Sequence, residues 1–335
     1  MGGKLLEIKD LVVHFFTEDG VVKALDGVGF HVNSEETFAL VGETGCGKSV
    51  TMLSVLGLIP IPGKVINGEV LFYDEDLRHE LGIGGSGPVD LLKLSPELMN
   101  RVRGKRISLI TQDPMTSLNP VYTSGNQIME VLTTHRGVDR RGAESETFRL
   151  LESVALVPPK QIAEKYPHQL SGGERQRVVA SISLAASPNL IIADEPTTNL
   201  DVTVQARILE LLLELKERFR TSLIMITHDL GIVAETSDRV GVMYAGSVVE
   251  LSDVFALFKE PLHPYTKGLL EAIPNPRKRR KGPLKSIPGS VPDLIDPPEG
   301  CRFHPRCELA SEICREDKPE LREISTGHYV ACHHV

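Results

Sequence analysis

One segment early in the chain combines the residue types that hold phosphate. It is Gly42-Glu43-Thr44-Gly45-Cys46-Gly47-Lys48-Ser49, which fits the pattern G-x-x-x-x-G-K-[ST]. Glycines let the backbone curl so that successive N–H groups point at one anion, and the helix that follows adds donors and the positive end of its dipole. Lys48 is expected to reach the β- and γ-phosphates of a nucleotide, and Ser49 to coordinate Mg²⁺. An ordinary glycine-rich turn is the alternative. The predicted nucleotide contacts in this segment are Thr44, Gly45, Cys46, Gly47, Lys48, Ser49 and Val50.

Residues suited to nucleotide hydrolysis follow three other apolar strands. Ligands of open parallel sheets bind at the carboxyl ends of the strands, so these residues are expected beside the phosphate-binding loop. Asp194, behind four apolar residues, is predicted to hold Mg²⁺ through water, and Glu195 to polarise the attacking water. Gln112 is expected to touch the metal and this water, and His228 to bridge the γ-phosphate and the Glu195 carboxylate. Helix capping is the alternative role for the carboxylate pair. The predicted catalytic residues are Glu195, His228 and Gln112, and the predicted Mg²⁺ ligands are Ser49, Gln112 and Asp194.

A second helix also opens with glycines, at Ser171-Gly172-Gly173. Such a helix N-terminus is a second potential anion site. The first loop already wraps the phosphates of one nucleotide, so a second site makes most sense if it serves the nucleotide of another subunit. The sequence therefore suggests a head-to-tail pair of chains with ATP between them, in which Ser171 and Gly173 contact the nucleotide.

The elements that must position these residues alternate between strand and helix. Continuous apolar strands at 37–41, 107–110, 190–193 and 223–226, separated by helices, predict a parallel sheet covered by helices. Residues 5–41 alternate apolar and polar positions, which is typical of half-exposed antiparallel strands with a turn at 18–20. A helical pattern occupies 126–156. Beyond Lys259 the content of Pro, Gly and Arg rises, which predicts a domain boundary near residue 260.

Residues 82–87 form a second glycine-rich pattern, G-x-G-x-x-G. This is the pattern of a dinucleotide-binding turn, but a charged segment precedes it and Pro88 follows with no helix starting there. A mobile surface insertion is therefore the favoured interpretation.

The composition is that of an ordinary soluble globular protein. The 335 residues are 41% apolar and 24% charged, which is enough for one large or two modest domains. No run approaches the ~18 apolar residues of a membrane helix, and the first residues lack the apolar region of a signal peptide, so we expect a cytoplasmic protein. A net charge of −8 argues against a general nucleic-acid binder. The basic run Lys278–Lys281 is interpreted as solvated linker.

Four of the five cysteines crowd the last tenth of the chain, as C-x₅-C-x₆-C-x₁₇-C. In a reducing compartment this group suggests a metal or iron–sulfur site before disulfides, with a structural role. The spacing is neither that of bacterial ferredoxins nor that of a regular zinc finger, so a [4Fe–4S] cluster and a tetrahedral Zn²⁺ both remain open. Cys46 stands apart: it is interpreted as a small residue that fits the loop, with a reactive thiol as the alternative. The four C-terminal cysteines are Cys301, Cys307, Cys314 and Cys332.

Taken together and in order, these motifs resemble those of the ATPases of ABC transporters. Gly42–Ser49 is similar to Walker A, Gln112 to the Q-loop, Leu170–Glu174 to the signature, Leu190–Glu195 to Walker B, Asn199-Leu200-Asp201 to the D-loop, and His228 to the H-loop. The resemblance covers residues 5 to about 255. It implies an α/β fold with a P-loop NTPase (RecA-like) core, an antiparallel β subdomain and a helical subdomain at about 113–178. It also implies that Asp201 contacts the nucleotide and that an aromatic ring, Phe15 or alternatively Phe16, stacks on the adenine.

Three further segments narrow the resemblance to the ATPase subunits of dipeptide and oligopeptide permeases. They are Gln112–Pro120, Pro264-Tyr265-Thr266 after His263, and Pro283–Pro292 followed by Cys301–Cys307. The resemblance implies a nucleotide-binding domain at 1–260, a permease-specific extension at 261–335, and ATP and Mg²⁺ as cofactors. It favours a [4Fe–4S] cluster over zinc, because some family members hold such a cluster at these cysteines.

The same resemblance implies a set of partners. They are a second ATPase subunit, identical or paralogous, two membrane-spanning permease subunits and, indirectly, an extracytoplasmic peptide-binding protein; no nucleic acid is expected. The chain would then lie at the cytoplasmic face of the membrane. The alternatives are an ABC-type ATPase that acts on nucleic acid or ribosomes, and an ABC importer for another solute. A single cassette with no heptads between Walker A and the signature favours transport.

Overall fold

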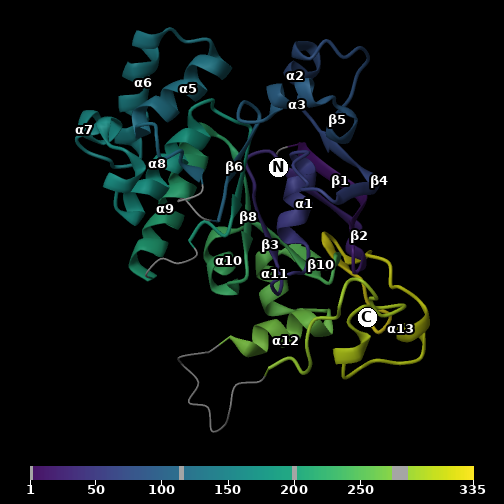
Figure 1. Ribbon diagram of the computed structural model, residues 1–335. Helices are drawn as coiled ribbons and strands as arrows, with labels where there is room; N and C mark the ends of the chain where they lie inside the picture. Colours follow the sequence, from purple (N-terminus) through teal and green to yellow (C-terminus); the bar gives the residue numbers. More distant parts are fainter. Residues whose placement is uncertain (1–2, 113–116, 198–201, 274–285) are drawn as a thin grey trace.

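The computed structural model describes residues 3–112, 117–197, 202–273 and 286–335. In this part of the chain the strands form two sheets, which Figure 1 shows together with the helices. The smaller sheet has the order β2-β1-β4-β5, and the larger has the order β11-β12-β10-β9-β3-β8-β7-β6. The basic run Lys278–Lys281 lies outside the described residues.

The smaller sheet is the antiparallel unit expected for the first part of the chain. Its strands are β1 (Lys4–Thr17), β2 (Gly20–Asn33), β4 (Gly63–Phe72) and β5 (Val89–Asp90). Thr17 pairs with Gly20 at the turn between β1 and β2, so the predicted hairpin is confirmed. One face packs on a shared apolar core with α1 (Lys48–Val55) and β3 (Thr37–Val41). That packing fixes the residues on both sides of the phosphate-binding loop.

The glycine-rich stretch 82–87 lies between α2 (Glu75–Glu80) and β5, ahead of η1 (Leu91–Lys93) and α3 (Pro96–Val102). The Arg78 guanidinium donates hydrogen bonds to the carbonyls of Gly84, Gly85, Gly87 and Pro88. A short strand, not a helix, follows the glycines. The stretch therefore lacks the strand-to-helix setting of a dinucleotide-binding turn.

The larger sheet carries the parallel strands that the apolar runs predict. They are β3, β6 (Ile107–Ile110), β7 (Leu190–Asp194), β8 (Ser222–Thr227) and β9 (Arg239–Tyr244). Each pairs in parallel with its neighbour, in the order β6-β7-β8-β3-β9. All residues of β3 and β8 are buried, because helices cover both faces of such a sheet. The carboxyl ends of four of these strands therefore meet at one edge, where ligands bind in open parallel sheets.

A helical lobe stands to one side of the larger sheet (Figure 1). It contains α5 (Ser124–Arg136), α6 (Arg140–Ser153), α7 (Pro159–Glu164), η2 (Pro167–Gln169), α8 (Gly172–Leu184) and α9 (Val202–Phe219). The helical pattern at 126–156 is two helices, because Gly137 ends α5 in the left-handed conformation and the Asp139 carboxylate caps α6. None of the helices in the described ranges is long and apolar enough to cross a membrane.

The last part of the chain continues the larger sheet. β10 (Ser247–Asp253) pairs with β12 (His328–Val330), which pairs with β11 (Arg322–Ser325). The fully buried Glu250 on β10 accepts hydrogen bonds from the N–H groups of Leu262 (2.7 Å) and His263 (2.9 Å) and bonds to His328 Nε2 (2.8 Å). These contacts hold the start of α12 against the sheet. The other helices here are α10 (Leu230–Thr236), α11 (Val254–Lys259), α12 (Pro264–Ala272), η3 (His304–Arg306) and α13 (Ile313–Glu316).

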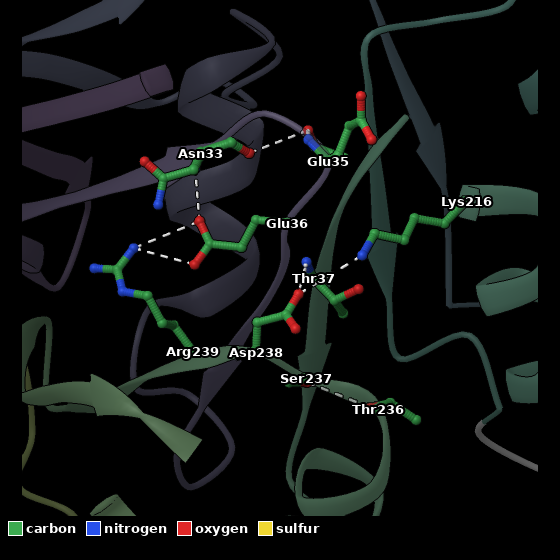
Figure 2. A network of polar contacts seen from close by, with 10 residues as sticks. Asn33, Glu35, Glu36, Thr37, Lys216, Thr236, Ser237, Asp238 and Arg239 are labelled. Carbon is green, nitrogen blue, oxygen red and sulfur yellow. Dashed lines mark hydrogen bonds and ion pairs between the residues drawn. The ribbon is translucent and has the colours of Figure 1, made fainter. Parts of the chain in front are cut away.

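A polar network fixes the amino end of β3, at the far end of that strand from the phosphate-binding loop (Figure 2). The Glu36 carboxylate accepts from Arg239 Nη1 (3.2 Å) and from the N–H of Asn33 (2.6 Å). The Asp238 carboxylate accepts from the N–H of Thr37 (2.8 Å) and pairs with Lys216 (3.6 Å). Backbone groups at this strand end thus have side-chain partners, and β3 is held at its start independently of the loop.

Candidate functional site

The phosphate-binding loop lies between the carboxyl end of β3 and α1, as its pattern predicts. Gly42 and Gly47 have φ values of +154° and +107°. A Cβ at Gly42 would lie 2.2 Å from the carbonyl oxygen of Met243, and one at Gly47 would lie 2.6 Å from Leu25 Cδ2. Only glycine fits either position, for conformation and for space. Thr44, Gly45 and Ser49 are exposed, so the loop presents its backbone to solvent on the side where a ligand would enter.

Lys48 lies across this loop. Its Nζ donates to the carbonyl oxygens of Gly42 (2.7 Å) and Glu43 (3.1 Å), and the side chain is buried. The Cys46 thiol is also buried, and burial raises its pKa. A thiol with a raised pKa carries little thiolate, so the packing interpretation of Cys46 fits the structure better than a reactive one. Val50 is half-buried in the first turn of α1.

The three predicted catalytic side chains meet at the same edge. Gln112 follows β6, Glu195 follows β7 and His228 follows β8. Gln112 Nε2 donates to Glu195 Oε2 (3.0 Å), and His228 Nδ1 lies 3.2 Å from Glu195 Oε1. Glu195 has φ +44° and its N–H donates to the carbonyl of Ile226 on β8. The left-handed conformation of Glu195 ends β7 and orients the carboxylate toward Gln112 and His228. A carboxylate held in this way can polarise a water molecule.

The predicted magnesium ligands Ser49 and Asp194 are hydrogen-bonded to each other. Burial, and beyond it the charge of Glu195, raise the pKa of Asp194, although the Ser49 hydroxyl and Lys48 act in the opposite direction. A carboxylate that is partly desolvated and next to a second carboxylate gains from a nearby cation. The donor set of hydroxyl, carboxylate and amide oxygen is the kind that Mg²⁺ prefers. These residues therefore fit a magnesium ion.

The second glycine-rich helix start is built around Ser171. Its Oγ accepts from the N–H of Glu174 (3.3 Å), while the Glu174 carboxylate accepts from the N–H of Ser171 (2.7 Å). This capping box leaves Ser171 and Gly172 exposed at the surface. Figure 1 shows α8 in the helical lobe, apart from α1. The signature and the phosphate-binding loop of one chain are thus held on different parts of the molecule, as a head-to-tail pair requires.

The two candidate rings for adenine lie next to each other near the end of β1. Phe15 is partly buried and packs against the core of the smaller sheet. Phe16 is exposed, and Lys64 Nζ lies 5.6 Å from the centre of its ring. Asp201, the remaining predicted nucleotide contact, lies outside the described residues.

The four C-terminal cysteines lie in the small extension around η3 and α13. Burial, and beyond it the charges of Cys314, Cys307 and Cys332, raise the pKa of Cys301 to about 11. The N–H of Cys301 donates to the carbonyl of Cys314 (2.9 Å), and Cys314 Sγ lies 3.5 Å from His334 Nε2. Among the described residues, no group of three or more His, Cys, Asp or Glu side chains is arranged so that it could hold a metal ion. The iron–sulfur and zinc predictions therefore have no support from the geometry of a site.

The sequence did not indicate that the C-terminal extension contacts the phosphate-binding loop. Glu43, the second residue of the loop, donates its N–H to the hydroxyl of Tyr265 (2.9 Å) and pairs with Arg306 (2.7 Å). Both partners lie in segments that carry the permease resemblance, but they are more than 200 positions from the loop. No local pattern relates residues so far apart in sequence. The signal in the sequence was that these segments contain Arg, His and aromatic residues, which can make such contacts.

The fold and the site together define a P-loop ATP-binding cassette. A family model described as "ABC transporter" matches residues 25–198, and one described as "Oligopeptide/dipeptide transporter, C-terminal region" matches residues 249–314. The structure is similar to the ATP-binding cassette MJ0796 in its dimeric, post-hydrolysis state bound to ADP and Pi. The TM-score is 0.62 and the identity 23%, over 75% of this chain and 99% of that one. This likeness shows the fold.

Curated relatives match along nearly the whole chain. The probable peptide ABC transporter ATP-binding protein y4tR of Sinorhizobium fredii is 48% identical over 98% of this chain and 94% of its own length. The oligopeptide transport ATP-binding protein OppD of Bacillus subtilis is 47% identical over 98% and 88%. The dipeptide transport ATP-binding protein DppD of Escherichia coli is 42% identical over 98% and 96%. The chain belongs to the ABC transporter family, among the ATP-binding proteins of oligopeptide and dipeptide transporters. It is an ABC-type ATPase.

Proposed function

We propose that this chain powers the uptake of di- or oligopeptides by hydrolysing ATP between two ATPase subunits. The observation that carries the catalytic part is the convergence of Gln112 and His228 on the carboxylate of Glu195. The match of residues 249–314 to the C-terminal region of peptide transporters and the names of the relatives support the peptide substrate.

The loop and Lys48 bind the phosphates in this proposal. Lys48 exchanges the carbonyl oxygens of Gly42 and Glu43 for phosphate oxygens, since its ammonium already lies at the centre of the loop. The N–H groups of the loop and of the first turn of α1 donate to the same phosphates. Phe15 stacks on the adenine, with Phe16 as the alternative. Ser49, Gln112 and Asp194 hold Mg²⁺, which neutralises charge on the phosphates when it is bound.

Glu195 acts as the general base for hydrolysis. Its carboxylate accepts a proton from the water that attacks the γ-phosphate, and Gln112 holds that carboxylate from one side. His228 bonds to the other carboxylate oxygen and reaches the γ-phosphate with its free ring nitrogen. The two side chains fix the orientation of the base, so that little motion is needed when the water reacts.

A second subunit completes the site. Ser171 and Gly173 of the partner, at the exposed start of its α8, contact the γ-phosphate from the opposite side. Asp201 is a further nucleotide contact in this proposal. The separation of α8 from α1 within one chain supports this arrangement (Figure 1). ATP thereby joins the two subunits, and hydrolysis lets them part. We propose that residues 1–260 form the nucleotide-binding domain, with a helical subdomain at about 113–178, and residues 261–335 the extension.

The proposed assembly places the chain at the cytoplasmic face of the membrane, beneath two membrane-spanning permease subunits that receive peptides from an extracytoplasmic binding protein. The test is transport. Cells that lack this chain should lose uptake of a radiolabelled tripeptide but keep uptake of a labelled free amino acid. A plasmid that encodes the chain should restore tripeptide uptake. Two membrane proteins should co-purify with a tagged chain. Unchanged peptide uptake, or co-purification of ribosomes or nucleic acid in their place, would contradict the proposal.

We also propose that Cys301, Cys307, Cys314 and Cys332 hold a structural [4Fe–4S] cluster, with Zn²⁺ as the alternative. The support is that the four cysteines lie in one small extension, where the N–H of Cys301 donates to the carbonyl of Cys314 (2.9 Å). After burial, the charges of the other three thiols also raise the pKa of Cys301, and thiols so placed gain from a bound cation. Anaerobically purified protein should contain iron and acid-labile sulfide, and Cys314→Ser should lose both. Cys46→Ser is the matched control and should retain them. Protein that contains zinc but no acid-labile sulfide would support the Zn²⁺ alternative. Protein that contains neither iron nor zinc would contradict the proposal.

A further inference from the structure

The phosphate-binding loop receives support from the distant C-terminal extension. Three groups of Glu43 are held. Its N–H donates to Tyr265 Oη (2.9 Å), and its carbonyl accepts from Lys48 Nζ (3.1 Å) and from the N–H of Cys46 (3.2 Å). Its carboxylate forms two hydrogen bonds with the Arg306 guanidinium (2.7 and 3.2 Å). The N–H and the carboxylate are held by residues beyond position 260. Only the carbonyl of Glu43 is held from within the loop, by Lys48 and Cys46.

Both distant partners are rigidly placed. Tyr265, in the first turn of α12, is fully buried and packs against Tyr244 and Phe303, with ring centres 4.7 and 5.4 Å apart. Arg306 is almost fully buried, donates from Nε to the carbonyl of Pro288 (2.8 Å), and lies 5.7 Å from the ring centre of Tyr244. Because these contacts fix the guanidinium, it can donate two hydrogen bonds to the Glu43 carboxylate in a bidentate arrangement. This geometry makes Arg–carboxylate pairs specific.

A second arginine of the same segment supports the other side of the loop. Arg302 donates to the carbonyl of Ala245 and pairs with Asp26 (3.2 Å). The next residue, Gly246, donates its N–H to the carbonyl of Cys46 in the loop (2.8 Å). Arg302 and Arg306 both lie between Cys301 and Cys307. The short segment Cys301–Cys307 thus reaches the loop directly at Glu43 and through the β9–β10 turn at Cys46.

This support matters because the loop is weakly determined by its own residues. Gly42, Gly45 and Gly47 all have positive φ, and glycine loses more conformational freedom on ordering than any other residue. When ATP binds, Lys48 leaves the Glu43 carbonyl for the phosphates, and Tyr265 and Arg306 remain as the side chains that hold Glu43, beside the backbone contact from Cys46. A loop that is ordered before the nucleotide arrives binds it more tightly, since less freedom is lost on binding.

We propose that Arg306 and Tyr265 are positioning residues that order the phosphate-binding loop for ATP by holding Glu43. The inference rests on ATP binding at residues 42–49. It makes the C-terminal extension part of the ATP site, acting on nucleotide affinity and not on the chemical step. Removing the ion pair between Glu43 and Arg306 should therefore lower the affinity for ATP and leave the turnover of the saturated enzyme nearly unchanged.

A double-mutant cycle on the full-length chain tests this ion pair. Glu43→Gln and Arg306→Gln should each raise the Kd of a fluorescent ATP analogue by about 3- to 10-fold, and the double variant should be no weaker than either one. The kcat of the assembly purified with the tagged chain should stay within about twofold, so that the change falls on KM. Arg306→Lys should restore part of the affinity. Effects that multiply in the double variant, or an unchanged Kd in both single variants, would overturn the proposal.

Two further variants separate positioning from general stability. Tyr265→Phe keeps the ring in its aromatic cluster but removes the hydroxyl that accepts from Glu43, and it should also raise the Kd. Arg239→Gln breaks the ion pair with Glu36 at the other end of β3 (Figure 2), where both side chains are also largely buried. It should lower the melting temperature and leave the Kd unchanged. An equal rise in Kd for Arg239→Gln would assign the effect to destabilisation and overturn the proposal.

The same measurements distinguish failure of this inference from failure of the proposed site. If the wild-type chain binds the analogue and Lys48→Met does not, the loop is the ATP site, and the cycle reports on the Glu43 contact alone. If wild-type and Lys48→Met bind equally, the nucleotide lies elsewhere and the proposed function itself is wrong.

Discussion

Replacing Glu195 by Gln should almost abolish ATP hydrolysis while leaving ATP binding intact. The amide keeps the size of the side chain and can still bond to Gln112 and His228, whose nitrogens lie 3.0 and 3.2 Å from the carboxylate. It cannot accept a proton from water, so the contribution of a general base, about 10²- to 10⁴-fold, should be lost from kcat. Because the nucleotide is bound but not consumed, the variant should accumulate as an ATP-dependent dimer, measured by size-exclusion chromatography with Mg-ATP.

The matched control is Glu210→Gln, on the exposed face of α9. It makes the same chemical change away from the strand ends and should hydrolyse ATP at the wild-type rate. If the kcat of Glu195→Gln stays within about tenfold of the wild-type value, Glu195 is not the general base. The outcome also tests the alternative role of the carboxylate pair. If Asp194 and Glu195 only capped a helix, the substitution would lower the melting temperature and leave kcat unchanged.

Replacing Lys48 by Met should weaken ATP binding by about 10- to 100-fold, since a hydrogen bond to a charged group contributes roughly 1.5–3 kcal/mol. Methionine fills the space of the aliphatic stem, and the two carbonyls that Lys48 now contacts, those of Gly42 and Glu43, lose only a donor. The loop should therefore keep its fold while losing its charge. Titration of the full-length chain with a fluorescent ATP analogue measures the change.

The control for this variant is Lys259→Met, at the exposed end of α11. It removes one exposed positive charge outside the loop and should bind the analogue with wild-type affinity. If both variants bind as the wild type does, the triphosphate does not lie against Lys48. A parallel loss of affinity and of melting temperature in Lys48→Met would show that the ammonium holds the loop together and would contradict the expected role.

Much of the fold could be predicted because its signals are local. The alternation of apolar residues in 5–41 fixed which face of each strand is buried, and the continuous apolar runs identified strands covered on both sides. The break at Gly137 and Asp139 was less evident, because apolar spacing continues on both sides of it. Its signals were present, since glycine ends helices in the left-handed conformation and aspartate caps them.

The catalytic edge was predictable for a topological reason. Each of Gln112, Glu195 and His228 follows an apolar strand, and parallel strands present their carboxyl ends at one side of a sheet. Their proximity therefore follows from strand direction without knowledge of the strand order. The hydrogen bonds of Glu195 to both partners required the order β6-β7-β8, which places its strand between theirs.

By itself, the sequence of this protein determined the phosphate-binding loop, the strand-end side chains and the capped start of α8, because each depends on residues close together in the chain. Only the tertiary structure decided what surrounds Glu43. Tyr265 and Arg306 reach it because β12 pairs with β10, Glu250 anchors the start of α12, and the Cys301–Cys307 segment is thereby brought beside the loop. Contacts between residues more than 200 positions apart depend on the packing of the whole molecule, so local sequence patterns do not predict them.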